Sequence, residues 1–300
     1  MPLLSKVLLL SGASLITLVL CIGYYSPLSL INALTSSRSY VKHADISFGQ
    51  DARQKLDVYT PTSKTSKAPV VVFFYGGSWR SGSRSDYVFV AEALASKGIV
   101  TVIADYRLYP QVAYPTFLQD GAKAVEWTLN EISKYGGDPE QLFVMGHSAG
   151  AYNASMLALD QRWLAEVKSH PSKIRGWIGL AGPYNFLPIT DLDARPVFFY
   201  PNSPADSQPV MHVTSSAPPA LLIAPVVDQF VDPIRNTATL ANRLKTAGVS
   251  VNYLVFEKAN HTTLIGSLAW PLRSIAPTLE QISTFVLSDG GRKNPVEAAH

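Results

Sequence analysis

The run PVVVFFY at residues 69–75 is the feature that most narrowly constrains the fold of this chain. A strand that is apolar on both of its faces has to be covered on both faces, as in a parallel sheet between helices. Further strands and helices alternate along the chain, and this alternation predicts an α/β fold with a mostly parallel eight-stranded sheet and helices on both faces. We expect strands at 46–48, 55–59, 69–75, 99–104, 141–145, 176–180, 220–224 and 251–257, and helices at 87–97, 115–135, 149–159 and 234–247.

The first 37 residues differ from the rest because they contain a single charge, on Lys6. The 19 uncharged residues from Val7 to Tyr25 would span about 28 Å as a helix, close to the thickness of a bilayer core. Residues 1–37 therefore resemble a membrane segment, either an uncleaved signal anchor or a cleaved signal peptide with small residues around Cys21. A lipid on Cys21 is a third interpretation, which the bulky Leu20 disfavours. Under each interpretation the rest of the chain is exported to the periplasmic or extracellular face, where it is either anchored to the membrane or secreted.

The length of 300 residues and the change of pattern near Ser39 predict one domain over 39–288, followed by a polar tail at 289–300 that we expect to fray. Residues 182–219 interrupt the rhythm of strands and helices, and we interpret them as an insertion over one end of the sheet. The net charge of +3 is small and the basic residues are scattered, which argues against a nucleic-acid partner. The six His and one Cys have no metal-ligand spacing, so we expect no metal.

The segment Gly146-His147-Ser148-Ala149-Gly150 follows a predicted strand directly and precedes a predicted helix. This is the context that the G-x-S-x-G motif requires, because its serine stands on a sharp strand-to-helix turn. The flanking glycines permit a backbone that a side chain would obstruct. We predict that Ser148 is a nucleophile, the alternative being a serine that merely caps the helix. His147 we interpret as a packing residue that the turn directs elsewhere.

Two adjacent glycines, Gly76 and Gly77, follow the apolar strand at 69–75. Their N–H groups can face a ligand and stabilise the oxyanion of a tetrahedral intermediate. The N–H of Ala149, directly after the predicted nucleophile, would be a further donor. The alternative is that Gly76 and Gly77 form only a turn.

These motifs resemble those of α/β-hydrolases of the H-G-G-x-W and G-x-S-x-G esterase group, which includes hormone-sensitive-lipase-like carboxylesterases, feruloyl-esterase-like enzymes and kynurenine formamidases. The resemblance covers 39–287 and includes the stretches Asp105-Tyr106-Arg107-Leu108 and Gly136-Gly137-Asp138-Pro139. It implies the α/β-hydrolase fold. Tyr75 stands where the family usually has His. We interpret Asp105 and Arg107 as a structural ion pair.

The resemblance implies the order nucleophile, acid, histidine along the chain. His261 follows the predicted strand at 251–257 across a short turn, which places it at the edge of the sheet where catalytic loops gather. We therefore predict His261 as the general base, in preference to His212 in the insertion and His300 in the tail. For the acid the resemblance favours Asp228, and Asp232 is the alternative, its other role being to cap the following helix.

Together these residues predict a serine carboxylesterase that cleaves small or aromatic acyl esters through an acyl-enzyme, without a cofactor. Aromatic residues of the insertion and beside the glycines suggest an apolar pocket, with Trp79 and Tyr184 as its candidate lining. Two alternatives are an arylformamidase or other amide hydrolase, and a non-catalytic binding protein with a hydrolase fold. The oligomeric state has no signature in the sequence.

Overall fold

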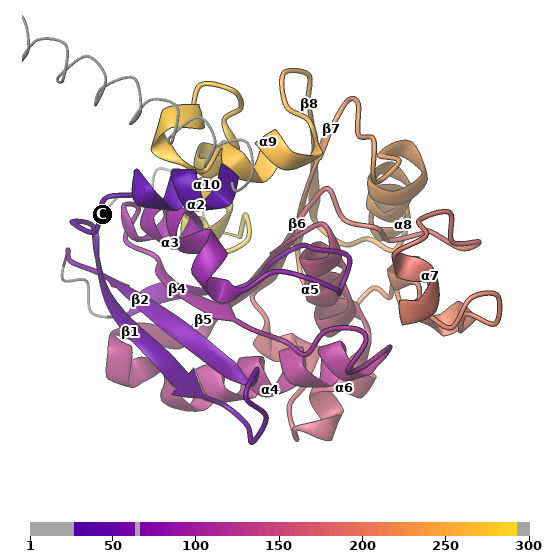
Figure 1. Cartoon of the computed structure of the whole chain (residues 1–300), viewed down its shortest axis with the longest axis horizontal. Helices are drawn as coiled ribbons and strands as arrows, with labels where there is room; N and C mark the ends of the chain where they lie inside the picture. The colour runs from indigo at the N-terminus through magenta and orange to yellow at the C-terminus, as the bar shows by residue number, and fades with distance from the viewer. Residues whose placement is uncertain (1–26, 64–66, 293–300) are drawn as a thin grey trace, which may run out of the picture.

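The computed structural model of the chain describes residues 27–63 and 67–292, which form one eight-stranded sheet with helices around it (Figure 1). The strand order is β1-β2-β4-β3-β5-β6-β7-β8. β1 and β2 are antiparallel to their neighbours, and the other strands run parallel, so the predicted mostly parallel sheet is confirmed. The strands are β1 (Tyr40–Ser47), β2 (Lys55–Pro61), β3 (Ala68–Phe74), β4 (Val100–Ala104), β5 (Gly137–His147), β6 (Gly176–Leu180), β7 (Ala220–Pro225) and β8 (Val251–Phe256).

The helices form two groups that cover the sheet. α3 and α10 contact each other, while α4, α5 and α6 contact one another. The α-helices are α2 (Pro27–Ala33), α3 (Val88–Ala95), α4 (Thr116–Glu131), α5 (Ala149–Leu159), α6 (Gln161–Glu166), α7 (Ala194–Val197), α8 (Thr239–Thr246), α9 (His261–Gly266) and α10 (Thr278–Leu287). The shorter turns are η1 (Arg84–Tyr87), η2 (Ile132–Tyr135), η3 (Pro171–Lys173), η4 (Ala205–Ser207), η5 (Pro209–Met211), η6 (Ile234–Ala238) and η7 (Trp270–Leu272).

The central strands owe their continuous apolar sequences to cover on both faces. Every residue of β4, β6 and β7 is buried, as is β3 apart from Pro69. The edge strand β1, by contrast, is exposed along most of its length. The run at 69–75 is thus the buried centre of the sheet, as its composition predicts.

Several predicted elements have different limits in the structure. The short strand expected at 46–48 is the end of the longer edge strand β1, and the helix expected at 87–97 is preceded by η1, which Ser83 caps. The helix expected at 234–247 begins with a π-helical turn, η6. A helix that was not predicted begins at His261, after the expected short turn, and Asn260 and Thr263 form its capping box.

The predicted membrane segment at 1–37 lies mostly outside the described residues, since Val7–Tyr25 precedes Pro27. Within 27–63 and 67–292, no helix has both the length and the apolar character needed to cross a bilayer. Most of the predicted tail, 293–300, is likewise outside the described residues. Its start does not fray: Asp289 is buried and accepts a 2.8 Å hydrogen bond from Nε of Arg175.

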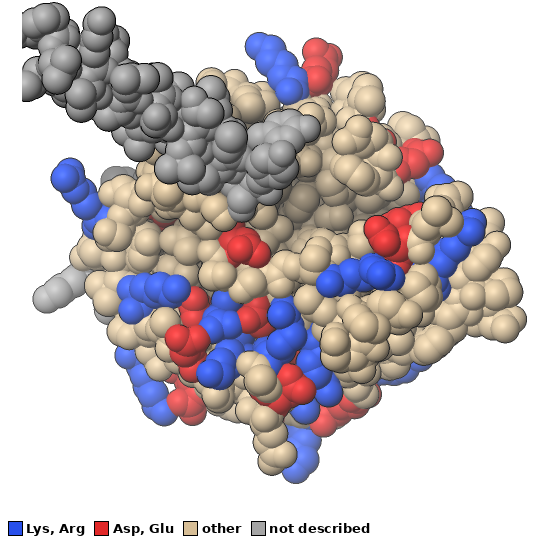
Figure 2. Space-filling model, in the orientation of Figure 1, with Lys and Arg blue, Asp and Glu red and all other residues tan. Residues whose placement is uncertain are grey.

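Charged side chains of both signs are interleaved on the face that Figure 2 shows. No extended basic stripe crosses that face, in agreement with the scattered Lys and Arg of the sequence. The electrostatic footprint of a nucleic-acid binder is therefore not visible on this side of the molecule.

Candidate active site

Ser148 stands on the turn between β5 and α5 with φ 54° and ψ −123°. Few residues other than glycine adopt a positive φ, and such strain is typical of a nucleophile held on a sharp turn. The flanking glycines are required by space: a Cβ on Gly146 would lie 2.0 Å from the carbonyl oxygen of Gly150, and one on Gly150 would lie 2.0 Å from that of Phe74. The motif therefore adopts the strand–turn–helix geometry that its sequence predicts.

The glycines that follow β3 approach this turn closely. A Cβ on Gly76 would lie 3.0 Å from the Cβ of Ser148, and Gly77 has φ +124°. Both glycines line the same cavity as Ser148 and Ala149. Ala149 is the first residue of α5, and an N–H group at this position has no acceptor within its own helix. The residues predicted to donate to an oxyanion thus line one cavity together with Ser148.

The N–H of Gly76 has a neighbour of its own, the phenol of Tyr87, which also lines the cavity. Burial and the charge of Asp86 raise the pKa of Tyr87 to about 12, and the hydrogen bond from Gly76 opposes that rise.

His261 and Asp228 form a hydrogen-bonded pair at the carboxyl end of the sheet, although they are 33 residues apart in the chain. Nδ1 of His261 donates to Oδ2 of Asp228 at 2.7 Å, and the side chain of Asp228 is only 1% exposed. Burial would raise the pKa of Asp228, but the hydrogen bond and charge of His261 and the N–H groups of Phe230 and Val231 outweigh it, so this pKa lies below its usual value. The carboxylate therefore stays ionised beside the imidazole.

Asp232 caps the start of a helix, which is the role that we predicted for it if it is not the catalytic acid. Its Oδ1 accepts N–H hydrogen bonds from Ile234 and Arg235 at 2.9 and 3.0 Å, at the start of η6. The geometry thus pairs His261 with Asp228, and Asp232 serves the helix.

A cavity of about 380 Å³ contains the exposed faces of Ser148 and His261. Trp79 lines it as predicted and donates its indole N–H to Oδ1 of Asn153 at 3.0 Å. The prediction for Tyr184 is wrong: its ring is fully buried against Trp177, 6.2 Å between centroids, and does not reach the cavity. Its neighbours Pro183 and Phe186 line the cavity instead.

His147 is the residue whose position the sequence interpretation missed. Its ring lines the cavity and lies 4.8 Å from that of His261, and its Nε2 is 2.9 Å from the carbonyl oxygen of His261. The signal that could have revealed this is its position as the last residue of β5, directly before Ser148.

Asp105 and Arg107 are both structural, but they do not pair with each other as expected. Asp105 pairs with Arg84, and Arg107 makes hydrogen bonds of 2.7 and 2.9 Å to Asp120. Their partners belong to different elements, since Arg84 lies in η1 and Asp120 in α4.

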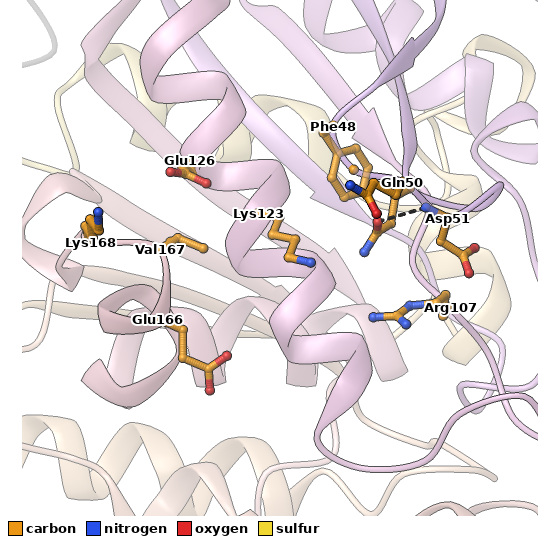
Figure 3. Close-up of a pocket in the computed structure, with 11 residues that line it drawn as sticks. Phe48, Gln50, Asp51, Arg107, Lys123, Glu126, Glu166, Val167 and Lys168 are labelled. Carbon is orange, nitrogen blue, oxygen red and sulfur yellow. Dashed lines mark hydrogen bonds between the residues drawn. The ribbon is translucent and has the colours of Figure 1, made fainter.

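A larger cavity of about 910 Å³ lies elsewhere, between the loop after β1 and the helices α4 and α6 (Figure 3). Asp51, Arg107, Lys123, Glu126 and Glu166 bring charges of both signs to its wall. It contains none of the predicted nucleophile, base or oxyanion residues. The cavity at Ser148 is therefore the candidate active site although it is the smaller one, because it contains the residues with the predicted catalytic chemistry.

Comparison with protein families matches residues 56–244 to the family described as BD-FAE. Among curated proteins, a probable isoprenylcysteine alpha-carbonyl methylesterase of Arabidopsis thaliana is 29% identical over 273 residues, covering 83% of this chain and 56% of the relative. Esterase LipC of Mycobacterium tuberculosis is 30% identical over 244 residues, covering 75% and 60%. The chain thus spans less than two thirds of the length of these two relatives. Kynurenine formamidase of Danio rerio is 27% identical over 230 residues, covering 75% and 76%.

Among solved structures, esterase B from Lactobacillus rhamnosis superimposes with a TM-score of 0.76 at 20% identity, covering 94% of this chain and 97% of the other. Esterase 2 of Thermogutta terrifontis gives 0.69 at 22% identity, with 85% and 96% covered. At these identities the likeness concerns the fold, which is that of the α/β-hydrolases.

Proposed function

We propose, because this chain belongs to the BD-FAE family, that it is a serine hydrolase of the carboxylesterase type. The observation that carries the proposal is the 2.7 Å hydrogen bond between His261 and Asp228, in the same site as the strained Ser148. A carboxylate that orients an imidazole beside an activated serine is the arrangement that nucleophilic acyl transfer requires. The curated relatives that are named as esterases support it.

In the proposed mechanism, Oγ of Ser148 attacks the carbonyl carbon of an ester while Nε2 of His261 takes its proton. The ionised Asp228 holds the Nδ1–H tautomer of His261 and stabilises the imidazolium that forms. The N–H groups of Gly77 and Ala149, with Gly76 as a further candidate, receive the negative charge of the tetrahedral oxygen. His261 then protonates the leaving alcohol, and a water activated by the same residue releases the acid from the acyl-enzyme.

The cavity favours a compact apolar acyl group. Trp79, Phe186 and Ile189 form an apolar wall, and a volume of about 380 Å³ has room for a short chain or one aromatic ring. We therefore propose small or aromatic acyl esters as the substrate class. No cofactor takes part in this mechanism.

A second candidate is the hydrolysis of a formamide or another amide. It is supported by the similarity to kynurenine formamidase, whose length this chain covers to 76%. The same residues would serve, with an amine as the leaving group. A non-catalytic binding protein is a third candidate, and the first experiment below excludes or supports it.

The purified full chain would be assayed with p-nitrophenyl acetate, butyrate and octanoate, an aromatic methyl ester and N-formylkynurenine. We expect turnover of the short esters, a fall at octanoate, and no turnover by Ser148→Ala. Preference for N-formylkynurenine would instead support the amide hydrolase, and inactivity on every substrate would support the binding protein.

The apolar residues 7–25 lie outside the described residues, and we propose that they act as a membrane segment ahead of the hydrolase domain at 39–288. Alkaline carbonate extraction of membranes from expressing cells tests this. Retention in the membrane pellet is expected for an anchor, whereas release of a shortened chain would indicate a cleaved signal peptide.

A further inference from the structure

The side chain of His147 is bound to the backbone of the candidate general base. Its Nε2 lies 2.9 Å from the carbonyl oxygen of His261. Because a carbonyl oxygen can only accept, Nε2 of His147 must carry the hydrogen and donate it. The two imidazole rings lie 4.8 Å apart, tilted by 50°.

His147 is held in a single protonation state. It is buried, and its Nδ1 has no hydrogen-bond partner in the part of the chain that the structure describes. Burial, and then the neighbouring His261, lower the pKa of His147 to about 3. The charged or titratable groups that act on it are His261 of α9 and Asp228 of the loop after β7. The Nε2–H donor is therefore present at every pH at which an esterase of this kind would work.

The hydrogen bond between His147 and His261 joins two segments of the chain that each carry a candidate catalytic residue. His147 ends β5, and the next residue is Ser148. His261, in contrast, begins the six-residue helix α9, which Asn260 caps from the preceding turn. The hydrogen bond from His147 therefore fixes the start of α9 to the strand end that bears the nucleophile.

We propose that His147 is a positioning residue. Its one side-chain hydrogen bond holds the general base His261 in place relative to the nucleophile Ser148, which is adjacent to His147 in the chain. The inference rests on the proposed function. The side chain of Asp228 orients the imidazole ring of His261, and the side chain of His147 fixes the backbone of His261. A misplacement of a catalytic group by 1 Å can cost about 100-fold in rate. The expected effect is therefore mainly on kcat, because the hydrogen bond acts on the position of His261.

The test compares His147→Phe with His147→Gln in the purified full chain. Phe keeps a ring but has no donor, whereas Gln carries an Nε2 donor the same number of bonds from Cα as that of His. We expect kcat for a short p-nitrophenyl ester to fall about 10- to 100-fold in His147→Phe, with KM changed less than about threefold. His147→Gln should recover most of that loss. The matched control is His43→Phe, an exposed histidine that packs on Tyr135 and should leave kcat unchanged.

A purely packing role makes a different prediction. It would lower the melting temperature in His147→Phe but leave the kcat of the folded fraction as in the parent chain. That result, or a Gln variant as slow as the Phe variant at equal folded content, would overturn the inference. If His147→Phe does not fold, His147→Leu replaces it as the variant without a donor. Activity of the parent chain that Ser148→Ala abolishes keeps the proposed function intact whichever way His147 behaves, and an inactive parent chain would refute the proposed function and the inference together.

Discussion

The hydroxyl of Tyr75 donates a 2.7 Å hydrogen bond to Oδ1 of Asp105. The guanidinium of Arg53 donates to the same hydroxyl at 2.7 Å, and Arg84 pairs with Asp105. The carbonyl oxygen of Tyr75 in turn accepts from the hydroxyl of Tyr106. Tyr75 immediately precedes Gly76 and Gly77, so this buried network supports the loop of the candidate oxyanion hole from behind.

Removing the hydroxyl in Tyr75→Phe should destabilise the protein. Asp105 would lose one buried donor and Arg53 one of its acceptors, while the carbonyl oxygens of Tyr106 and Gly82 still accept from Arg53. Such a loss typically costs about 1–3 kcal/mol. Urea denaturation followed by tryptophan fluorescence measures this change in the free energy of unfolding. Tyr253→Phe is the control, because Tyr253 is half-buried and its hydroxyl has no hydrogen-bond partner within residues 27–63 and 67–292. Equal stability of the two variants would show that the network contributes nothing.

Mutation should distinguish the roles of Asp228 and Asp232. Asp228→Asn keeps the shape of the side chain but no longer favours the Nδ1–H tautomer of His261, so kcat should fall by about 10³- to 10⁴-fold. Asp232→Asn retains an oxygen for the N–H groups of Ile234 and Arg235, so its kcat should stay within about threefold of the parent. Steady-state kinetics on one ester decide the point. A larger loss in Asp232→Asn would reverse the assignment.

Phe186 should limit the size of the acyl group. It lines the cavity beside Trp79, with ring centroids 6.3 Å apart, so Phe186→Ala enlarges the acyl end of the pocket. We expect the ratio of kcat/KM for octanoate to that for butyrate to rise about tenfold or more, since each added methylene gains apolar contact. Tyr184→Phe is the control, because Tyr184 is fully buried and does not line the cavity. An unchanged ratio in Phe186→Ala would place the acyl group elsewhere.

The buried, neutral His147 should make the fold sensitive to acid. Its pKa is about 3 in the folded chain against an ordinary value of 6.5. Above pH 6.5 both folded and unfolded chains hold it neutral, so it has no effect on stability. As the pH falls below 6.5, the unfolded chain binds a proton that the folded chain excludes. Stability then decreases by about 1.4 kcal/mol per pH unit from this group until the pH approaches 3.

The comparison that isolates this effect is the parent chain against His147→Phe, in urea melts at pH 7.5, 6 and 5. The difference in unfolding free energy between the two should shift in favour of His147→Phe as the pH falls. Parallel curves would show that His147 is protonated in the folded chain and that its burial does not exclude the proton.

The elements that the sequence predicted best are those with local causes. The run at 69–75 has one explanation, burial on both faces, and the glycines around Ser148 are dictated by contacts of about 2 Å. His261 and Asp228 could be placed because each follows a strand of a parallel sheet, whose carboxyl ends meet at one edge.

The failures have non-local causes. Whether Tyr184 or Phe186 faces the cavity depends on how the insertion folds back on Trp177 and Trp79, which no periodicity encodes. The expected Asp105–Arg107 pair failed because Arg84 and Asp120 come from other elements. His147 was missed because its partner is a backbone carbonyl 114 residues away.

The most direct test of the central claim is covalent labelling of Ser148 by a fluorophosphonate probe, read by peptide mass spectrometry. The proposed nucleophile predicts one labelled peptide containing Ser148, loss of label in Ser148→Ala, and slow labelling in His261→Ala. Labelling of Ser148→Ala at the rate of the parent chain would contradict the account.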